Sequence, residues 1–291
     1  MAKKRRWGDR RDGVLIREID PMHYIVPLLY PNRCDNEAFI SERIDLTNVN
    51  AYLERRNAEN PAYKYNLFQL IVTAVAKTVT LRPKLNRFIA NKSIYQRNEV
   101  SAAFVVKKLF ADDGAEALAF LHLKDSDDLE SIHQAIYAQV SARRSDDDKG
   151  DASTDSMDMF NRMPRWLSRF IVSVICWLDK HGWVPPSLIA TDPYYSSIVL
   201  TNLGSIKLHS GYHHLTNWGT NSLFLAIGEK KLRPFYDEAG NVTMKDSVDL
   251  GLTIDERLAD GYYYSKSVRL LRKLLENPEL LETPLNQEVK Y

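Results

Sequence analysis

The residues best suited to chemistry form one short segment, Asp255-Glu256-Arg257-Leu258-Ala259-Asp260-Gly261. It places acid, acid, base and acid before a glycine that permits a tight turn. The preceding residues alternate, so the apolar face of a strand over 248–254 carries Val248, Leu250, Leu252 and Ile254. Extended by two positions, this alternation points Glu256 toward the core or an interface, where a carboxylate is unusual and is a candidate base. The alternative is an ion-paired corner in which Arg257 or a distant arginine neutralises the carboxylates.

A second candidate is the histidine pair in Gly211-Tyr212-His213-His214-Leu215-Thr216-Asn217-Trp218-Gly219. Two adjacent imidazoles beside aromatic residues are candidates for a substitute base, a proton shuttle or the rim of a thiol site. Packed or hydrogen-bonded loop residues are the alternative interpretation. We expect no metal here, because adjacent residues seldom reach one ion and no cysteine or acid lies at a recognisable offset, although His209 is nearby.

The elements that must position these residues alternate between helix and strand. Asn66 and Gln69 resemble a capping box before a buried helix over 67–81, which Pro83 follows. Strands over 101–106 and 117–123, joined by Asp112-Asp113-Gly114, predict a hairpin. Other segments predict helices from Asp127 to Arg143-Arg144 and over 267–276, and strands at 197–204 and 223–228. The pattern favours an α/β fold, with a mixed, mostly antiparallel sheet packed against helices.

The charge balance excludes a typical nucleic-acid-binding module, because 39 basic residues face 38 acidic ones. The basic residues of the N-terminal arm predict a solvated segment, and the acid-rich residues 145–158 predict a flexible loop. Cys34 and Cys176 lie far apart and indicate a reducing compartment. We find no signal peptide and expect a soluble, cytoplasmic protein.

An amphipathic helix is predicted after Pro164, with an apolar stripe from Trp166 to Leu178 and a stop at Gly182. It is too short to span a bilayer. We favour a contact with the chain's own core or with another subunit. A peripheral membrane contact through 164–180 is the less favoured alternative.

The motifs also carry a resemblance to a known family. Asp255, Arg257, Asp260 and Gly261 match the Asp-His-Arg-x-x-Asp-Gly motif of the dihydrolipoamide acyltransferases. These are the catalytic domains of the 2-oxoacid dehydrogenase complexes, and they share their fold with chloramphenicol acetyltransferase. Glu256 stands where the family has its histidine. Further similar segments are Thr201-Asn202-Leu203-Gly204, Leu225 to Gly228, Ala74 to Asn86 and Leu274 to Leu281.

The resemblance covers about residues 20–282 and implies a chloramphenicol acetyltransferase-like α+β two-layer sandwich. It divides the chain into a basic arm (1–19), one acyltransferase-like domain (20–282) and a C-terminal tail (283–291). Residues 145–190, the acidic loop and amphipathic helix, have no counterpart in the family pattern and are interpreted as an insertion. No lipoyl domain precedes this core in the sequence.

The resemblance implies acyl transfer between a coenzyme A thioester and an acceptor, at sites between the subunits of a homotrimer. Thr201 would stabilise the oxyanion, and Glu256, His213 or His214 would replace the base. Asp260 would hold the site by pairing with an arginine, for which Arg33 is a candidate. The sequence leaves open which acyl donor and acceptor are used and whether trimers assemble further.

The replaced histidine weakens the implied activity. With reference pKa values, proton transfer from a thiol to a glutamate is about 3 kcal/mol less favourable than transfer to a histidine. Burial of the glutamate would narrow this difference. The alternative is therefore a catalytically inactive homotrimeric scaffold or regulatory protein of the same fold.

Overall fold

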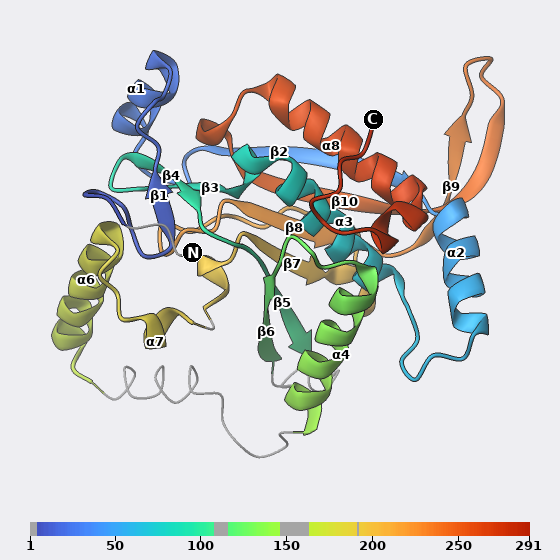
Figure 1. Ribbon diagram of the computed structural model, residues 1–291, viewed down its shortest axis with the longest axis horizontal. Coiled ribbons are helices and arrows are strands. Elements are labelled where there is room, and N and C mark those ends of the chain that lie inside the picture. Colours follow the sequence, from blue (N-terminus) through green and yellow to red (C-terminus); the bar gives the residue numbers. More distant parts are fainter. Residues whose placement is uncertain (1–4, 108–115, 146–162, 191) are drawn as a thin grey trace.

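Two β-sheets and a set of helices make up the computed structural model, which describes residues 5–107, 116–145, 163–190 and 192–291 (Figure 1). The strands are β1 (Gly13–Leu15), β2 (Glu37–Asp45), β3 (Arg87–Ala90), β4 (Ser93–Arg97), β5 (Val100–Lys107), β6 (Glu116–Leu123), β7 (Ile198–Asn202), β8 (Leu223–Ile227), β9 (Lys231–Tyr236) and β10 (Val242–Asp255). The α-helices are α1 (Pro21–Leu29), α2 (Thr47–Ala58), α3 (Leu67–Leu81), α4 (Leu129–Ser145), α6 (Arg165–His181), α7 (Pro186–Ile189) and α8 (Gly261–Glu276).

The larger sheet has the strand order β2-β10-β8-β7-β5-β6, and β9 pairs with the first half of β10. The pairs β5–β7 and β7–β8 are parallel, whereas the other neighbours are antiparallel. Strands β1, β4 and β3 form a separate small sheet. The predicted mixed, mostly antiparallel α/β architecture is therefore confirmed, as is the predicted β5–β6 hairpin. Its predicted turn at 112–114 lies outside the described residues.

Helices α3 and α8 pack with the larger sheet to form the main hydrophobic core. Helix α3 spans the predicted residues, and its capping box is present: the Asn66 side chain accepts from the Gln69 backbone N–H, while the Gln69 side chain accepts from the Asn66 N–H. Residues 69–79 are all buried, including the charged Lys77. The Lys77 ammonium is satisfied by the backbone carbonyls of Leu280, Thr283 and Pro284.

Two helices begin at positions other than predicted, and caps explain both differences. Helix α4 begins at Leu129 rather than at Asp127, because the Asp128 carboxylate accepts from the Ser131 backbone N–H. Helix α8 begins at Gly261, six residues before the predicted start. The Asp260 side chain caps it by accepting from the Tyr263 N–H. The polar and aromatic first turns of α8 lack the apolar spacing that marks its second half.

Among the described N-terminal residues, Arg10 departs from the expected solvated arm. Strand β1 pairs with β4 in the small sheet. Arg10 is buried and donates to both oxygens of the Asp12 carboxylate at 2.8 and 3.0 Å, and also to the backbone oxygen of Asp179 at 2.6 Å. Arg10 thereby joins the N-terminal segment (residues 5–15) to α6, while Arg5, Arg6 and Arg11 remain exposed. Most of the predicted acidic loop lies outside the described residues.

The predicted amphipathic helix is α6, and Gly182 ends it in the left-handed conformation, as its position after the helix predicts. Helix α6 lies at one side of the molecule, whereas the hairpin of β9 and the first half of β10 projects from the other (Figure 1). In the described residues, no helix is long and apolar enough to cross a membrane.

The loop over residues 207–222 passes very close to β10. A Cβ atom added to Gly251 would lie 2.0 Å from the backbone oxygen of Gly211. Glycine at 251 is therefore required by the approach of the loop, whereas a Cβ added to Gly211 itself would meet nothing within 4 Å. This contact fixes the loop that carries the histidine pair over β10.

We therefore expect Gly251→Ala to lower the free energy of unfolding by about 1–3 kcal/mol, because the new methyl group overpacks the contact. Gly211→Ala is the matched control and should change stability by less than about 0.5 kcal/mol, as for a surface substitution. Chemical denaturation of both variants measures the difference. Equal stabilities would contradict the close approach of loop and strand.

Candidate active site

The predicted motif begins where β10 ends, and its first aspartate is fully buried. Asp255 accepts hydrogen bonds from Arg257 Nε at 2.7 Å and from Arg257 Nη2 at 2.6 Å, a bidentate ion pair in which both side chains are buried. The Arg257 Nη1 group donates to the backbone oxygen of Tyr30 at 2.7 Å, which links the motif to the end of α1. The ion-paired corner considered from the sequence is therefore present.

A second buried arginine completes this corner. Arg33 Nε lies 3.8 Å from Asp255 Oδ2, so one carboxylate faces two guanidinium groups. Burial lowers the pKa of Arg33, and the negative charge of Asp255 acts against that decrease. Arg33 donates to the backbone oxygens of Thr216 at 2.7 Å and of Gly219 at 3.1 Å. The same guanidinium thus holds the loop that follows the histidine pair.

Arg97 holds the end of that loop from the other side. It is buried and donates to the backbone oxygens of Tyr195 and Thr220, both at 2.7 Å. Burial lowers the pKa of Arg97 to about 10. Because the carbonyls of Thr216, Gly219 and Thr220 accept from buried guanidinium groups, this stretch is held in place without belonging to a helix or strand.

Asp179 at the end of α6 joins the same network. Its carboxylate accepts from the Tyr195 hydroxyl at 2.6 Å and from the Gly219 backbone N–H at 3.2 Å. Burial raises the pKa of Asp179, while these hydrogen bonds and Arg10 oppose the increase. Helix α6, the N-terminal segment and the loop are thereby joined through one buried carboxylate.

The prediction that Glu256 points toward the core is wrong, whereas the alternative that it faces an interface concerns a second chain and stays a prediction. Strand β10 ends at Asp255, and Glu256 begins a single turn of 3₁₀-helix, so the two-residue alternation stops one position before it. The Glu256 side chain is exposed, while its backbone N–H donates to the Asn36 carbonyl at 3.1 Å. A single chain therefore does not bury Glu256, and burial is what would make a glutamate a better substitute for the family's histidine.

The proposed pairing of Asp260 with Arg33 is also wrong. Asp260 is exposed and caps α8, whereas Arg33 lies beside Asp255. The two aspartates are separated by the 3₁₀ turn, which buries Arg257 and leaves Asp260 on the surface. The structural ion pair thus forms at the first aspartate of the motif rather than at its last.

The histidine pair lies at the same end of the sheet as Glu256. The His213 ring stacks on Phe224, with 4.2 Å between ring centroids and 6° between planes. Leu215 directly follows the histidine pair, and its backbone N–H donates to the carboxylate of Glu37. Glu37 is paired in register with Asp255. Both imidazoles are exposed. Among the described residues, no group of three or more His, Cys, Asp or Glu side chains is arranged to hold a metal ion.

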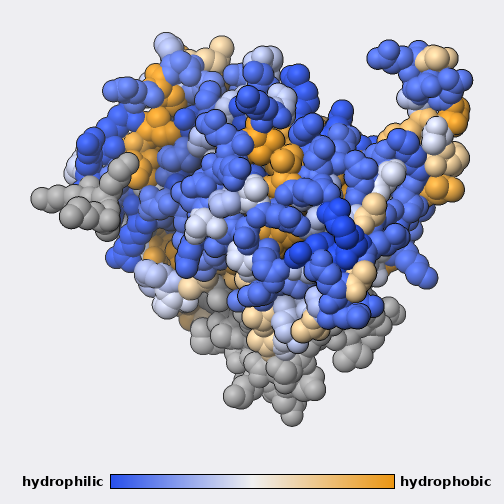
Figure 2. Space-filling view, turned by 45° about the vertical axis from the view of Figure 1, so that its right-hand side comes forward, coloured by the Kyte–Doolittle hydropathy of each residue, from blue (hydrophilic) through white to orange (hydrophobic). Residues whose placement is uncertain are grey.

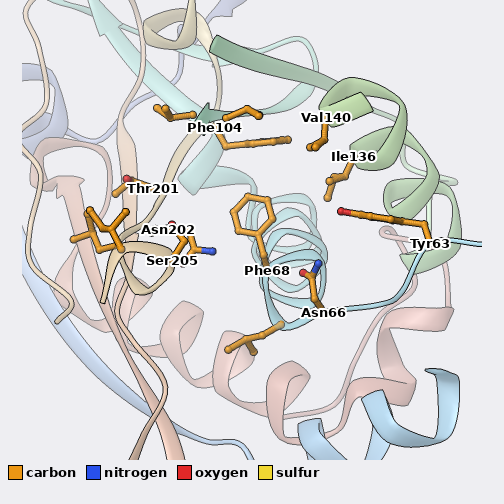
Figure 3. Close-up of a pocket in the computed structure, with 14 residues that line it drawn as sticks. Tyr63, Asn66, Phe68, Phe104, Ile136, Val140, Thr201, Asn202 and Ser205 are labelled. Atoms are coloured by element: carbon orange, nitrogen blue, oxygen red, sulfur yellow. Dashed lines mark hydrogen bonds between the residues drawn. The ribbon is translucent and has the colours of Figure 1, made fainter. Parts of the chain in front are cut away.

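Thr201 lies elsewhere, beside a cavity of about 390 Å³ (Figure 3). Figure 3 shows Thr201, Asn202 and Ser205 on one side of this cavity and Tyr63, Ile136 and Val140 on the other, with Phe68 between them. Its apolar lining includes Leu67, Phe68, Phe104, Val106, Ile136 and Val140. The sequence prediction missed this cavity, because these residues read as ordinary core positions of separate elements.

Strand register separates Thr201 from Glu256 within one chain. Thr201 is opposite Ala226 of β8, and Ala226 is opposite Gly251 of β10. Glu256 follows Gly251 by five residues, so it lies about 17 Å further along the sheet at about 3.3 Å per residue. One chain therefore does not bring the proposed hydroxyl and base to the same reacting atom.

The comparison with solved structures establishes the fold. A probable dihydrolipoamide acetyltransferase from Listeria monocytogenes superposes with a TM-score of 0.59 at 15% identity, covering 90% of this chain and 94% of that one. An Azotobacter vinelandii dihydrolipoamide acetyltransferase gives 0.58 at 16% identity, covering 92% and 94%. A chloramphenicol acetyltransferase gives 0.57 at 13% identity, covering 90% and 99%. The chain has the chloramphenicol acetyltransferase-like fold.

The sequence comparison finds a family model that matches part of the chain. Residues 188–283 match the family model described as 2-oxoacid dehydrogenases acyltransferase (catalytic domain). This range contains Thr201, the histidine pair and the whole Asp255–Gly261 motif. No curated protein sequence matches the chain. The resemblance to the acyltransferase catalytic domains is therefore confirmed, and the chain contains an acyltransferase core-like domain.

The burial of Asp255 yields a stability prediction. We expect Asp255→Asn to lower the free energy of unfolding by about 3–5 kcal/mol, because it leaves two buried guanidinium groups without their counter-charge. Asp260→Asn is the matched control and should be nearly neutral, since asparagine also caps a helix well. Thermal or urea unfolding compares them. The reverse order of effects would show that Asp260 carries the structural ion pair.

Proposed function

We propose that the protein is a coenzyme A-dependent acyltransferase whose sites form between the subunits of a homotrimer. The observation that carries the proposal is the match of residues 188–283 to the acyltransferase family, combined with the separation of Thr201 from Glu256 within one chain. In a closed ring of three chains, each interface joins two different surfaces. Thr201 of one chain and Glu256 of the next are then able to face one site.

The proposed reaction transfers an acyl group from a thioester to a nucleophilic acceptor. Glu256 accepts the proton of the attacking thiol, hydroxyl or amine, and the nucleophile bonds to the carbonyl carbon. The Thr201 hydroxyl donates a hydrogen bond to the resulting oxyanion. The carbon–sulfur bond then breaks, and the proton passes from Glu256 to the departing thiolate. His213 and His214 lie at the Glu256 end and are candidate shuttles for that proton.

The cavity beside Thr201 supports the acyl-thioester assignment. Its lining is apolar at Phe68 and Phe104 and polar at Asn66, Asn202 and Ser205. A long acyl thioester has the same division, with an apolar chain and an arm that contains amide groups. Ligand sites commonly combine an apolar lining with a few polar groups in this way.

The projecting hairpin supports assembly. Leu232, Tyr236, Val242 and Met244 are more than half exposed, and the register places Tyr236 opposite Val242. Figure 2 shows hydrophobic side chains along this hairpin, which stands away from the body of the molecule. Exposed apolar patches commonly mark interaction surfaces. We propose that a neighbouring copy of the chain covers this hairpin.

Subunit mixing tests the shared site. We expect Thr201→Ala and Glu256→Gln to lower acyl transfer separately, measured as release of free coenzyme A from a panel of acyl donors. When the two variants are refolded together at equal amounts, about one quarter of the sites regain both residues if neighbouring chains contribute them. Activity should return toward that fraction of the wild type. A site within one chain predicts no recovery, and that result would contradict the proposal.

Assembly is tested at the hairpin. We expect Leu232→Ser with Tyr236→Ser to reduce the mass in solution from three chains to one, because the substitutions remove apolar area from the contact. The exposed aromatic Tyr137 on α4 offers the control Tyr137→Ser, which should leave the mass unchanged. Light scattering coupled to gel filtration measures both. A monomeric wild type, or an unchanged trimer in the double variant, would contradict a role of the hairpin in assembly.

An inactive scaffold is the second candidate, and a specific observation favours it. Glu256 replaces the family's histidine and is exposed, so the chain alone lacks the buried base that acyl transfer to a thiol requires. A scaffold predicts a trimer that neither binds coenzyme A nor turns over any acyl donor. Calorimetric titration of the wild type with coenzyme A distinguishes this candidate from a slow enzyme.

A further inference from the structure

Helix α6 is attached to the molecule mainly by one end. Asp179, in its last turn, is the buried residue of this helix, and the network of Arg10, Tyr195 and Gly219 holds it there. The remaining turns are half-buried on one side and exposed on the other. The helix therefore does not cover the chain's own core, which was one of the two favoured interpretations of its sequence.

The exposed side of α6 is aromatic and apolar. Trp166, Phe170, Val174 and Trp177 are 71%, 63%, 40% and 51% exposed. Their spacing of four, four and three residues places them in one stripe along the helix. Trp183, just beyond the helix, is 60% exposed and packs edge-on against Trp177 with ring centroids 5.4 Å apart. Such a continuous exposed stripe marks an interaction surface.

The charges around this stripe are positive. Arg165, Arg169 and Lys180 are exposed, and from Met163 to Ala190 the sequence contains a single acidic residue, Asp179. Asp179 is buried, so it presents no negative charge at the surface. The exposed part of α6 thus combines tryptophans with basic residues alone, which is complementary to a negatively charged surface.

The N-terminal segment extends the same surface. The Arg10 guanidinium lies against Gly182, where an added Cβ would meet its Cζ at 3.2 Å, and it donates to the Asp179 carbonyl. The neighbouring residues Arg5, Arg6 and Arg11 are exposed, and Trp7 is 97% exposed. Figure 1 shows this segment and α6 on the same side of the molecule, away from the β9–β10 hairpin.

We propose that α6 and the N-terminal segment form a docking surface for an anionic lipid bilayer. Helices that lie in the plane of a membrane interface carry aromatic and apolar residues on one face and lysine or arginine beside them. Tryptophan favours the interface, and clustered basic residues bind anionic headgroups. No acid is exposed among the described residues 5–15 and 163–190, and this favours a bilayer over a second copy of this chain. The proposal does not depend on the acyltransferase activity.

Vesicle flotation tests the proposal with the full chain. We expect the wild type to float with vesicles of phosphatidylcholine and phosphatidylglycerol, and not with vesicles of phosphatidylcholine alone. Binding should weaken as salt is raised, because salt screens the contact with headgroups. Tryptophan emission should shift to shorter wavelength on binding. A wild type that stays with the unbound fraction at low salt would overturn the proposal.

Paired variants locate the surface. Arg165→Glu with Arg169→Glu should weaken binding by about tenfold or more, because each basic residue near an anionic surface contributes about 1 kcal/mol. Trp166→Ser with Phe170→Ser should also release the protein. The matched control is Arg269→Glu with Lys273→Glu, an exposed basic pair at the same spacing on α8, which should bind like the wild type.

Each remaining outcome decides against the bilayer. Equal loss of binding in the α8 control would show nonspecific attraction of a charged protein. Unchanged binding in both α6 variants would place the contact elsewhere. If Trp166→Ser with Phe170→Ser changes the mass in solution while the wild type ignores vesicles, the stripe covers a second copy. Circular dichroism confirms that each variant is folded.

Discussion

The structure depends on a buried carboxylate that faces two guanidinium groups. Asp255 pairs with Arg257 in its own turn and with Arg33 from a distant segment, and Arg33 continues to the carbonyls of Thr216 and Gly219. Removing charges from water is costly, so such a group persists when every partner is in place. The end of β10, the segment around Arg33 that leads into β2, and the loop after the histidine pair are consequently held together.

Within the motif, the residues of the buried ion pair differ from the residues that face outward. The buried members, Asp255 and Arg257, are committed to one another, whereas Glu256 and Asp260 face outward. The arrangement presents Glu256 on a fixed turn at the same end of the sheet as the exposed His213 and His214. A surface held this firmly and left uncovered is well prepared for a partner surface, which agrees with a site completed by a neighbouring chain.

Much of the fold was predictable because local patterns and tertiary packing agree. Helix α3 has both a capping box and apolar spacing, and its bounds match the prediction. Strand β10 is longer than predicted, because its first half lies in an exposed hairpin without the buried alternation. The site was less predictable. A two-residue period does not reveal where a strand ends, so the direction of Glu256 was wrong, and Arg33 reaches Asp255 only through tertiary folding.

The position of β10 also determines when the molecule is able to fold during synthesis. This strand lies between β2, near the start of the chain, and β8, and Asp255 is paired with Glu37. A nascent chain therefore exposes the inner edges of both strands until β10 has left the ribosome. Pairing over such sequence separation is slow. We infer that the larger sheet closes only once β10 is available, and that transient association of open strand edges is the main hazard until then.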